Sequence, residues 1–162
     1  MLNDKLTPLE AVAFAVRSEM ESTNLYAKLI EKVRNPKVKR MLSELADDEE
    51  QHRMGLMNLY RRMLGGEEPS IPMEDGRKKE WDIDPDADPL VVMTKARDKE
   101  LDSERFYQEA AKAVQDFKTR MFFIELAETE RRHAVVLDAQ VQKLHADPHW
   151  FEREDDAVHL GP

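Results

Sequence analysis

The chain has 162 residues, 41% of them hydrophobic and 36% charged, which suits one domain with a single sizeable core. Its net charge is −9 and it has no basic patch interleaved with aromatic residues, which argues against nucleic acid as a partner. The lack of cysteine excludes disulfides, iron–sulfur clusters and Cys-ligated metals in this sequence. No apolar run approaches the roughly 18 residues of a membrane span and no signal-peptide core precedes the first helical pattern, so we expect a cytoplasmic protein without a membrane partner.

The first half of the chain predicts a hairpin of two helices. The capping box Thr7-Pro8-Leu9-Glu10, with proline at the first helical position, begins a helix over 8–34. Asn35-Pro36 ends that helix and caps a second one over 36–64, which Gly65-Gly66 terminates. In both helices apolar residues recur at alternating spacings of three and four, which is typical of the buried seam of a helix bundle.

A long connector over 65–88 separates this hairpin from the rest of the chain. It is rich in proline, glycine and charge. About 20 extended residues reach on the order of 65 Å, whereas a helix of about 28 residues is roughly 42 Å long. The connector can therefore run the length of a bundle and set the helices on its two sides parallel. Trp81 and Ile83 are expected to hold it against the bundle surface.

The second half predicts another hairpin, with helices over 89–115 and 117–146 that begin at Asp-Pro and aspartate caps. The tail over 148–162 is acidic apart from its aromatic residues. We expect Trp150 and Phe151 to dock on the bundle or on a partner.

The two hairpins form an internal repeat with an offset of 81 residues, the distance from Glu49 to Glu130. Each half carries one glutamate in its first helix and a Glu-x-x-His pair in its second. Equal distances from the two hairpin turns place these side chains at one height, and their seam positions turn them inward. The six residues are Glu19, Glu49, His52, Glu100, Glu130 and His133.

Four carboxylates and two imidazoles in one buried layer predict a metal site. Each isolated buried ion would cost several kcal/mol. Two divalent cations would balance four carboxylates, and each cation would gain one histidine; this ligand set occurs in carboxylate di-iron bundles and suits iron, manganese or zinc. The alternative, in which these residues lie on solvated helix faces, conflicts with the unbroken apolar seam.

These motifs resemble those of the ferritin-like superfamily and, within it, the rubrerythrin family. The resemblance covers roughly residues 8 to 146 and includes a tyrosine seven residues after each single glutamate. It implies an all-α, ferritin-like four-helix bundle over 1–147, made of two repeated hairpins joined by a crossover. Tyr26 and Tyr107 would be either buried core residues or partners of the site.

The same resemblance implies a carboxylate-bridged di-iron centre. Glu49 and Glu130 would bridge two iron ions, and His52 and His133 would each bind one. Glu19 and Glu100 would be the terminal ligands. Such a centre oxidises Fe(II) with dioxygen or peroxide, so we expect an oxidoreductase that reduces one of these molecules. We also expect the chain to form a homodimer.

Two departures from the rubrerythrin pattern affect the expected chemistry. Rubrerythrins typically add a Cys-rich rubredoxin domain, and a sequence without cysteine needs an external electron donor instead. Ser103 stands where rubrerythrins carry an extra glutamate, with Glu104 beside it. Glu104 reaches the centre as a fifth carboxylate, stays protonated with a raised pKa and carries protons, or leans outward to water.

The departures leave other functions open. A non-catalytic, iron-handling protein is one alternative, and a metal-free helical interaction protein is another. The neighbouring acidic residues Asp47, Asp48 and Glu50 are interpreted as part of a solvated face.

Overall fold

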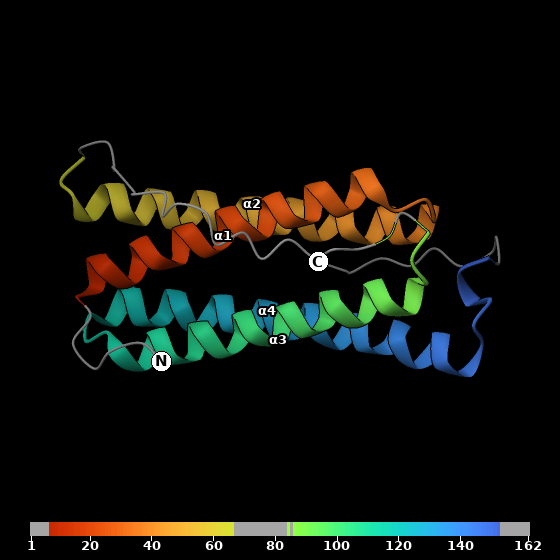
Figure 1. Cartoon of the computed structure of the whole chain (residues 1–162). Helices are drawn as coiled ribbons and strands as arrows, with labels where there is room; N and C mark the ends of the chain where they lie inside the picture. Colours follow the sequence, from red (N-terminus) through yellow and green to blue (C-terminus); the bar gives the residue numbers. More distant parts are fainter. Residues whose placement is uncertain (1–6, 67–83, 85, 153–162) are drawn as a thin grey trace.

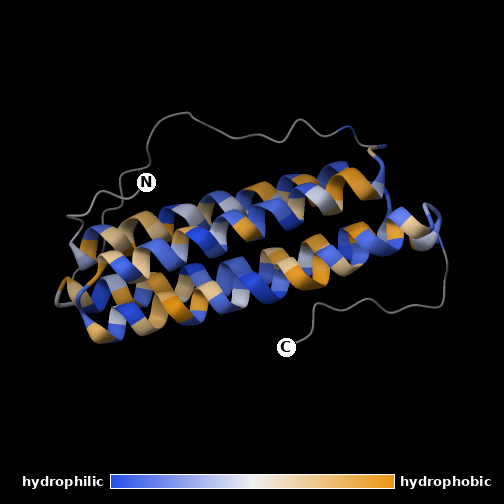
Figure 2. Ribbon diagram, turned by 90° about the horizontal axis from the view of Figure 1, so that it is seen from below, coloured by the Kyte–Doolittle hydropathy of each residue, from blue (hydrophilic) through white to orange (hydrophobic). Residues whose placement is uncertain are grey.

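A computed structural model describes residues 7–66, 84 and 86–152 of the chain. Within these residues the fold is all-α and has no strand, which confirms the predicted four-helix bundle. The helices are α1 (Pro8–Lys32), α2 (Pro36–Met63), α3 (Pro89–Ala113) and α4 (Phe117–Ala146), followed by a short 3-10 turn, η1 (Trp150–Glu152). Apolar and polar residues alternate in short stretches along each helix, as expected for helices with one buried face (Figure 2).

The helices pair as two antiparallel hairpins, α1 with α2 and α3 with α4 (Figure 1). Helices α2 and α3 run in the same direction, and α1 runs opposite to α3. This is the arrangement that a connector running the length of the bundle permits; Trp81 and Ile83 of that connector lie outside the described residues. None of the helices in the described ranges combines the length and the apolar content needed to cross a membrane.

The first helix of each hairpin ends two residues before the predicted position. Val33 and Val114 adopt extended backbone conformations and turn their side chains into the core. Asn35 and Asp116 then cap the next helix, Asn35 by accepting hydrogen bonds from the amides of residues 37 and 38 and Asp116 from the amide of residue 119. Each hairpin turn thus combines an inward valine with a polar cap, which shortens the preceding helix.

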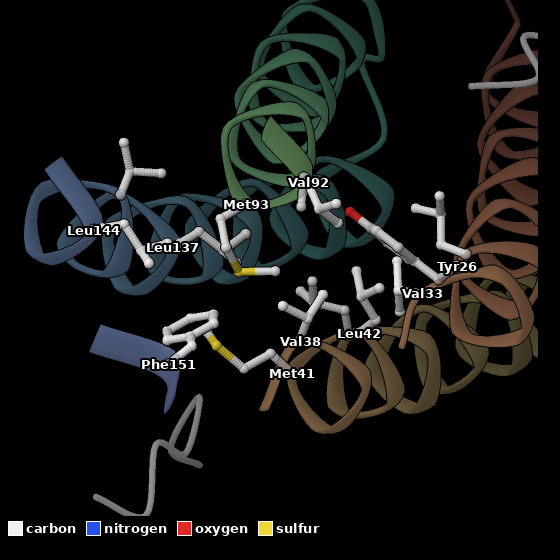
Figure 3. Close-up of a cluster of buried hydrophobic side chains, with 14 residues drawn as sticks. Tyr26, Val33, Val38, Met41, Leu42, Val92, Met93, Leu137, Leu144 and Phe151 are labelled. Carbon is white, nitrogen blue, oxygen red and sulfur yellow. The ribbon is translucent and has the colours of Figure 1, made fainter. Parts of the chain in front are cut away.

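Two apolar clusters fill the bundle, one on each side of a polar layer at mid-height. All four helices contribute to each cluster. One lies at the end where α1 meets α2 and is drawn in Figure 3. The other lies at the opposite end, where α3 meets α4. The polar layer is therefore enclosed by apolar side chains from both directions along the bundle.

Phe151 extends the first cluster beyond the end of α4. Its side chain is 4% exposed and packs beside Met41 and Leu144 (Figure 3). The neighbouring Trp150 donates a hydrogen bond from Nε1 to Gln140 Oε1 at 3.1 Å. The two aromatic residues of the predicted tail therefore dock on the bundle itself.

Replacing Phe151 with alanine is expected to destabilise the bundle by about 3 kcal/mol, because it leaves a cavity in a well-packed cluster. Phe117→Ala is the matched control, since that phenylalanine is 71% exposed and its loss should change the free energy of unfolding by less than about 0.5 kcal/mol. Urea denaturation of both variants measures the difference. Equal effects would show that the 3-10 turn does not belong to the core.

Candidate metal centre

The polar layer consists of four glutamates that are almost completely buried, one from each helix. These four residues are at most 1% exposed, although a buried carboxylate ordinarily needs a compensating charge. Two histidines accompany them, one on α2 and one on α4. The six residues that the repeat singles out, Glu19, Glu49, His52, Glu100, Glu130 and His133, therefore lie together in one layer.

The ligand atoms of this layer form two overlapping sets of four. Two glutamates are common to both sets. The first set adds a glutamate from α1 and a histidine from α2, and the second adds a glutamate from α3 and a histidine from α4. The sets are Glu19, Glu49, His52 and Glu130, and Glu49, Glu100, Glu130 and His133. Within each set one ligand atom per residue lies within 4.8 Å of all the others. Glu49 and Glu130 belong to both sets, so both lie between two potential cation positions.

Several carboxylate oxygens of the layer have no hydrogen-bond donor. Both oxygens of Glu49 and of Glu130, and Oε2 of Glu19, are buried without a hydrogen-bond partner among the described residues. His52 Nδ1 lies 2.9 Å from Glu130 Oε1, which is close enough for charge attraction but lacks hydrogen-bond geometry. Such unsatisfied oxygens are costly in an apolar interior. Their chemistry, hard carboxylate with imidazole, fits divalent iron, manganese or zinc.

The electrostatics of the metal-free layer reflect crowding of like charges. Burial, together with repulsion from Glu49 and Glu130, raises the pKa of Glu19 well above its usual range. Burial and the charge of Glu130 raise the pKa of Glu100 to about 7. Burial disfavours the imidazolium of His133, but its hydrogen bond to Glu100 and the negative charges of Glu100 and Glu130 outweigh burial and raise its pKa to about 10. Without metal, the layer therefore retains protons to limit its charge.

Two tyrosines connect the hairpins across the layer. Tyr26 donates a hydrogen bond to Glu100 Oε1, and Tyr107 donates one to Glu19 Oε1. Each tyrosine thus donates to the glutamate on the first helix of the other hairpin. Seven residues span about 10 Å along a helix, whereas the opposite direction of α3 brings the other glutamate to the same height. The antiparallel relation of α1 and α3 is the signal from which this pairing of each tyrosine with the opposite hairpin could have been predicted.

Two further polar residues lie at the layer, and the sequence pattern did not predict either of them there. The Asp48 carboxylate lies 3.0 Å from Nε2 of His133, so Asp48, whose side chain is 42% exposed as expected for a solvated face, also contacts the layer. The ammonium of Lys99 donates a hydrogen bond to Ser103 Oγ at 2.7 Å. Burial opposes the charge of Lys99, but the surrounding glutamates, Glu49 first among them, raise its pKa. Lys99 therefore keeps a positive charge beside the carboxylates.

Glu104 lies outside the layer. Its Oε1 accepts a hydrogen bond from Gln108 at 2.9 Å, and it lines a surface hollow between α3 and α4 with Arg120 and Arg131. Ser103 takes the buried position instead. The alternative in which Glu104 leans outward to water is the one that the structure shows, because the seam of α3 passes through residue 103.

Residues 10–141 match the family model described as rubrerythrin. Among solved structures, a hypothetical protein from Pyrococcus furiosus is similar, with a TM-score of 0.70 and 24% sequence identity over 86% of this chain and 90% of that chain. At this identity the similarity concerns the fold alone. No curated protein matches the sequence significantly.

The metal-free protein is expected to lose stability as the pH rises from about 5 to 8. Glu100 has a pKa of about 7 in the folded chain against an ordinary value of 4.5, so its contribution is fully present below pH 4.5 and is lost as the pH passes 7. His133 acts in the same direction at higher pH, because its folded pKa of about 10 exceeds 6.5.

Thermal melting of the metal-free chain and of Glu100→Gln across this pH range measures the effect. The variant should show a flatter profile between pH 5 and 8 than the unaltered chain. Parallel profiles would mean that Glu100 does not titrate in a buried environment.

Proposed function

The chain belongs to the rubrerythrin family, and from this premise we propose that the buried layer holds a pair of iron ions that reduces peroxide or dioxygen. The observation that carries the proposal is the sharing of Glu49 and Glu130 between two complete ligand sets. Four carboxylates would balance two divalent cations, which accounts for burying so much charge in one layer. Manganese or zinc would fit the same ligands.

The residues divide into two kinds of ligand under this proposal. Glu49 and Glu130 would bind both ions, because each belongs to both sets. The remaining ligands would bind one ion each, as two pairs: Glu19 with His52, and Glu100 with His133. A bound iron pair supplies two electrons, which together with two protons convert one hydrogen peroxide into two water molecules.

Other residues of the chain would prepare the layer for this chemistry. The two apolar clusters exclude water along the bundle axis, which strengthens electrostatic interactions inside. Tyr26 and Tyr107 hold the terminal carboxylates in place by hydrogen bonds from the opposite hairpin. Lys99 offsets part of the negative charge when metal is absent.

The electrons for repeated turnover would come from outside the chain. The sequence contains no cysteine, and therefore no Cys-ligated iron centre that could pass electrons to the layer. We therefore include an external donor in the proposal.

A second candidate function is iron oxidation or iron handling without peroxide turnover. This function is favoured by the burial of Ser103, and not of a glutamate, one turn after Glu100. Glu104 faces a surface hollow and adds no fifth carboxylate. This alternative uses the same metal ligands and differs only in the reaction.

The function is tested by loading the metal-free chain with Fe(II) under anaerobic conditions and adding peroxide with a supplied reductant. Glu49→Ala should lose at least one metal, and peroxide consumption should fall at least as much as the roughly 10–100-fold typical of changes around metal ligands. Glu125→Ala, an exposed carboxylate on α4, is the control and should behave like the unaltered chain.

The outcomes separate the candidates. Two bound irons with steady peroxide consumption support the reductase, whereas two irons that are oxidised once without turnover support iron handling. Two metals retained at unchanged affinity in Glu49→Ala would contradict the shared position of that glutamate.

A further inference from the structure

The two halves of the metal layer are not identical around their histidines. The 81-residue repeat places Asp48 and Thr129 in equivalent positions, each one residue before a glutamate shared by both ligand sets. Asp48 belongs to α2 and Thr129 to α4. The repeat therefore offers a carboxylate on one side and a hydroxyl on the other.

Asp48 contacts the outer nitrogen of the histidine on the opposite hairpin. His133 Nε2 lies 3.0 Å from Asp48 Oδ2. The inner nitrogen of the same ring, Nδ1, lies 3.3 Å from Glu100 Oε2 and 3.8 Å from Glu130 Oε2. The ring of His133 is thus held between the layer and a carboxylate that is 42% exposed on its side chain.

His52 has no corresponding support among the described residues. In the described residues its contacts with charged groups involve only Nδ1, which lies 2.9 Å from Glu130 Oε1 and 3.9 Å from Glu19 Oε2. The hydroxyl of Thr129 is engaged within its own helix, where it donates to the Glu125 carbonyl at 3.1 Å and accepts from Arg132 Nη2 at 2.9 Å. Among the residues that the structure describes, no carboxylate therefore contacts Nε2 of His52.

A carboxylate at the outer nitrogen changes the properties of a histidine ligand. By accepting the Nε2 hydrogen it leaves Nδ1 free to bind a metal, fixes the ring orientation and raises the basicity of the ligating nitrogen. It also adds one negative charge near one of the two metal positions. A proton on His133 competes with the metal, but a divalent ion carries twice the charge of a proton and gains more from the added carboxylate.

We propose that the two metal positions differ in affinity, and that the position formed by Glu100 and His133, which Asp48 supports, fills first. This inference rests on the proposed two-metal centre and goes beyond it by assigning an order to the two positions. Asp48 acts as a positioning residue, since it touches a ligand and not the metal itself.

The test is a titration of the metal-free chain with Co(II), followed by its visible absorption and by calorimetry. Two neighbouring cations repel each other, so two binding steps alone do not prove that the positions differ. The histidine variants decide: His133→Ala should remove the tight step, whereas His52→Ala should leave that step in place and remove the weak one. Equal effects of the two variants would overturn the proposal.

A second set of variants tests the role of the asymmetry itself. Asp48→Asn should weaken the tight step by about 10–100-fold, which is the usual effect of removing such a partner. Asp47→Asn, an exposed aspartate beside it on α2, is the matched control and should change nothing. The double variant Asp48→Asn with Thr129→Asp should reverse the order, so that the position at His52 fills first. An unchanged tight step in Asp48→Asn would contradict the assignment even if the double variant failed to fold.

The results also distinguish this inference from the proposed function. A chain that binds two Co(II) ions whose order does not depend on Asp48 keeps the two-metal centre and loses the inference. A chain that binds no Co(II) loses both.

Discussion

Repulsion among four buried carboxylates is the constraint on which the rest of this structure depends. Glu19, Glu49, Glu100 and Glu130 come from four different helices and meet where they are almost completely shielded from bulk solvent. The metal-free chain limits this repulsion with retained protons, with two histidines and with the ammonium of Lys99. None of these groups satisfies the free oxygens of Glu49 and Glu130. Two divalent cations would satisfy them, and this is the physical basis of the proposed function.

The bundle can hold such a layer because packing on both sides of it is apolar and shared by all four helices. The clusters at the two ends provide the stability that offsets the cost of the polar layer. The tyrosines join the hairpins at the layer, since each bonds to the glutamate of the opposite hairpin. The internal repeat therefore yields a nearly symmetrical centre, and the pair Asp48 and Thr129 is one place where the symmetry fails.

Most of the fold and the six clustered residues were predictable from the sequence because they rest on spacing alone. Caps such as Asn35 and Asp116 mark the helix ends, and the unbroken seam brings Glu49 and Glu130 inward. Contacts between helices were harder to predict, because they depend on small rotations about each helix axis. The seam of α3 passes through Ser103 and not Glu104, a rotation of one position that moves a carboxylate from the core to the surface.

The contact of Asp48 with His133 escaped prediction for the same kind of reason. The residue is partly exposed and adjacent to other acids, so its sequence pattern is that of a solvated face. Only the approach of α4 to α2 makes it a partner of the histidine. Residues that support a site from its rim carry no periodic pattern of their own, whereas ligands on the seam do.

The most direct measurement of the central claim is anomalous X-ray scattering at the iron edge from crystals of the chain loaded with Fe(II) without oxygen. The account predicts two peaks in the buried layer, both within bonding distance of Glu49 and Glu130, one beside Glu19 and His52 and the other beside Glu100 and His133. A single peak in the layer, or peaks only at surface carboxylates, would contradict it.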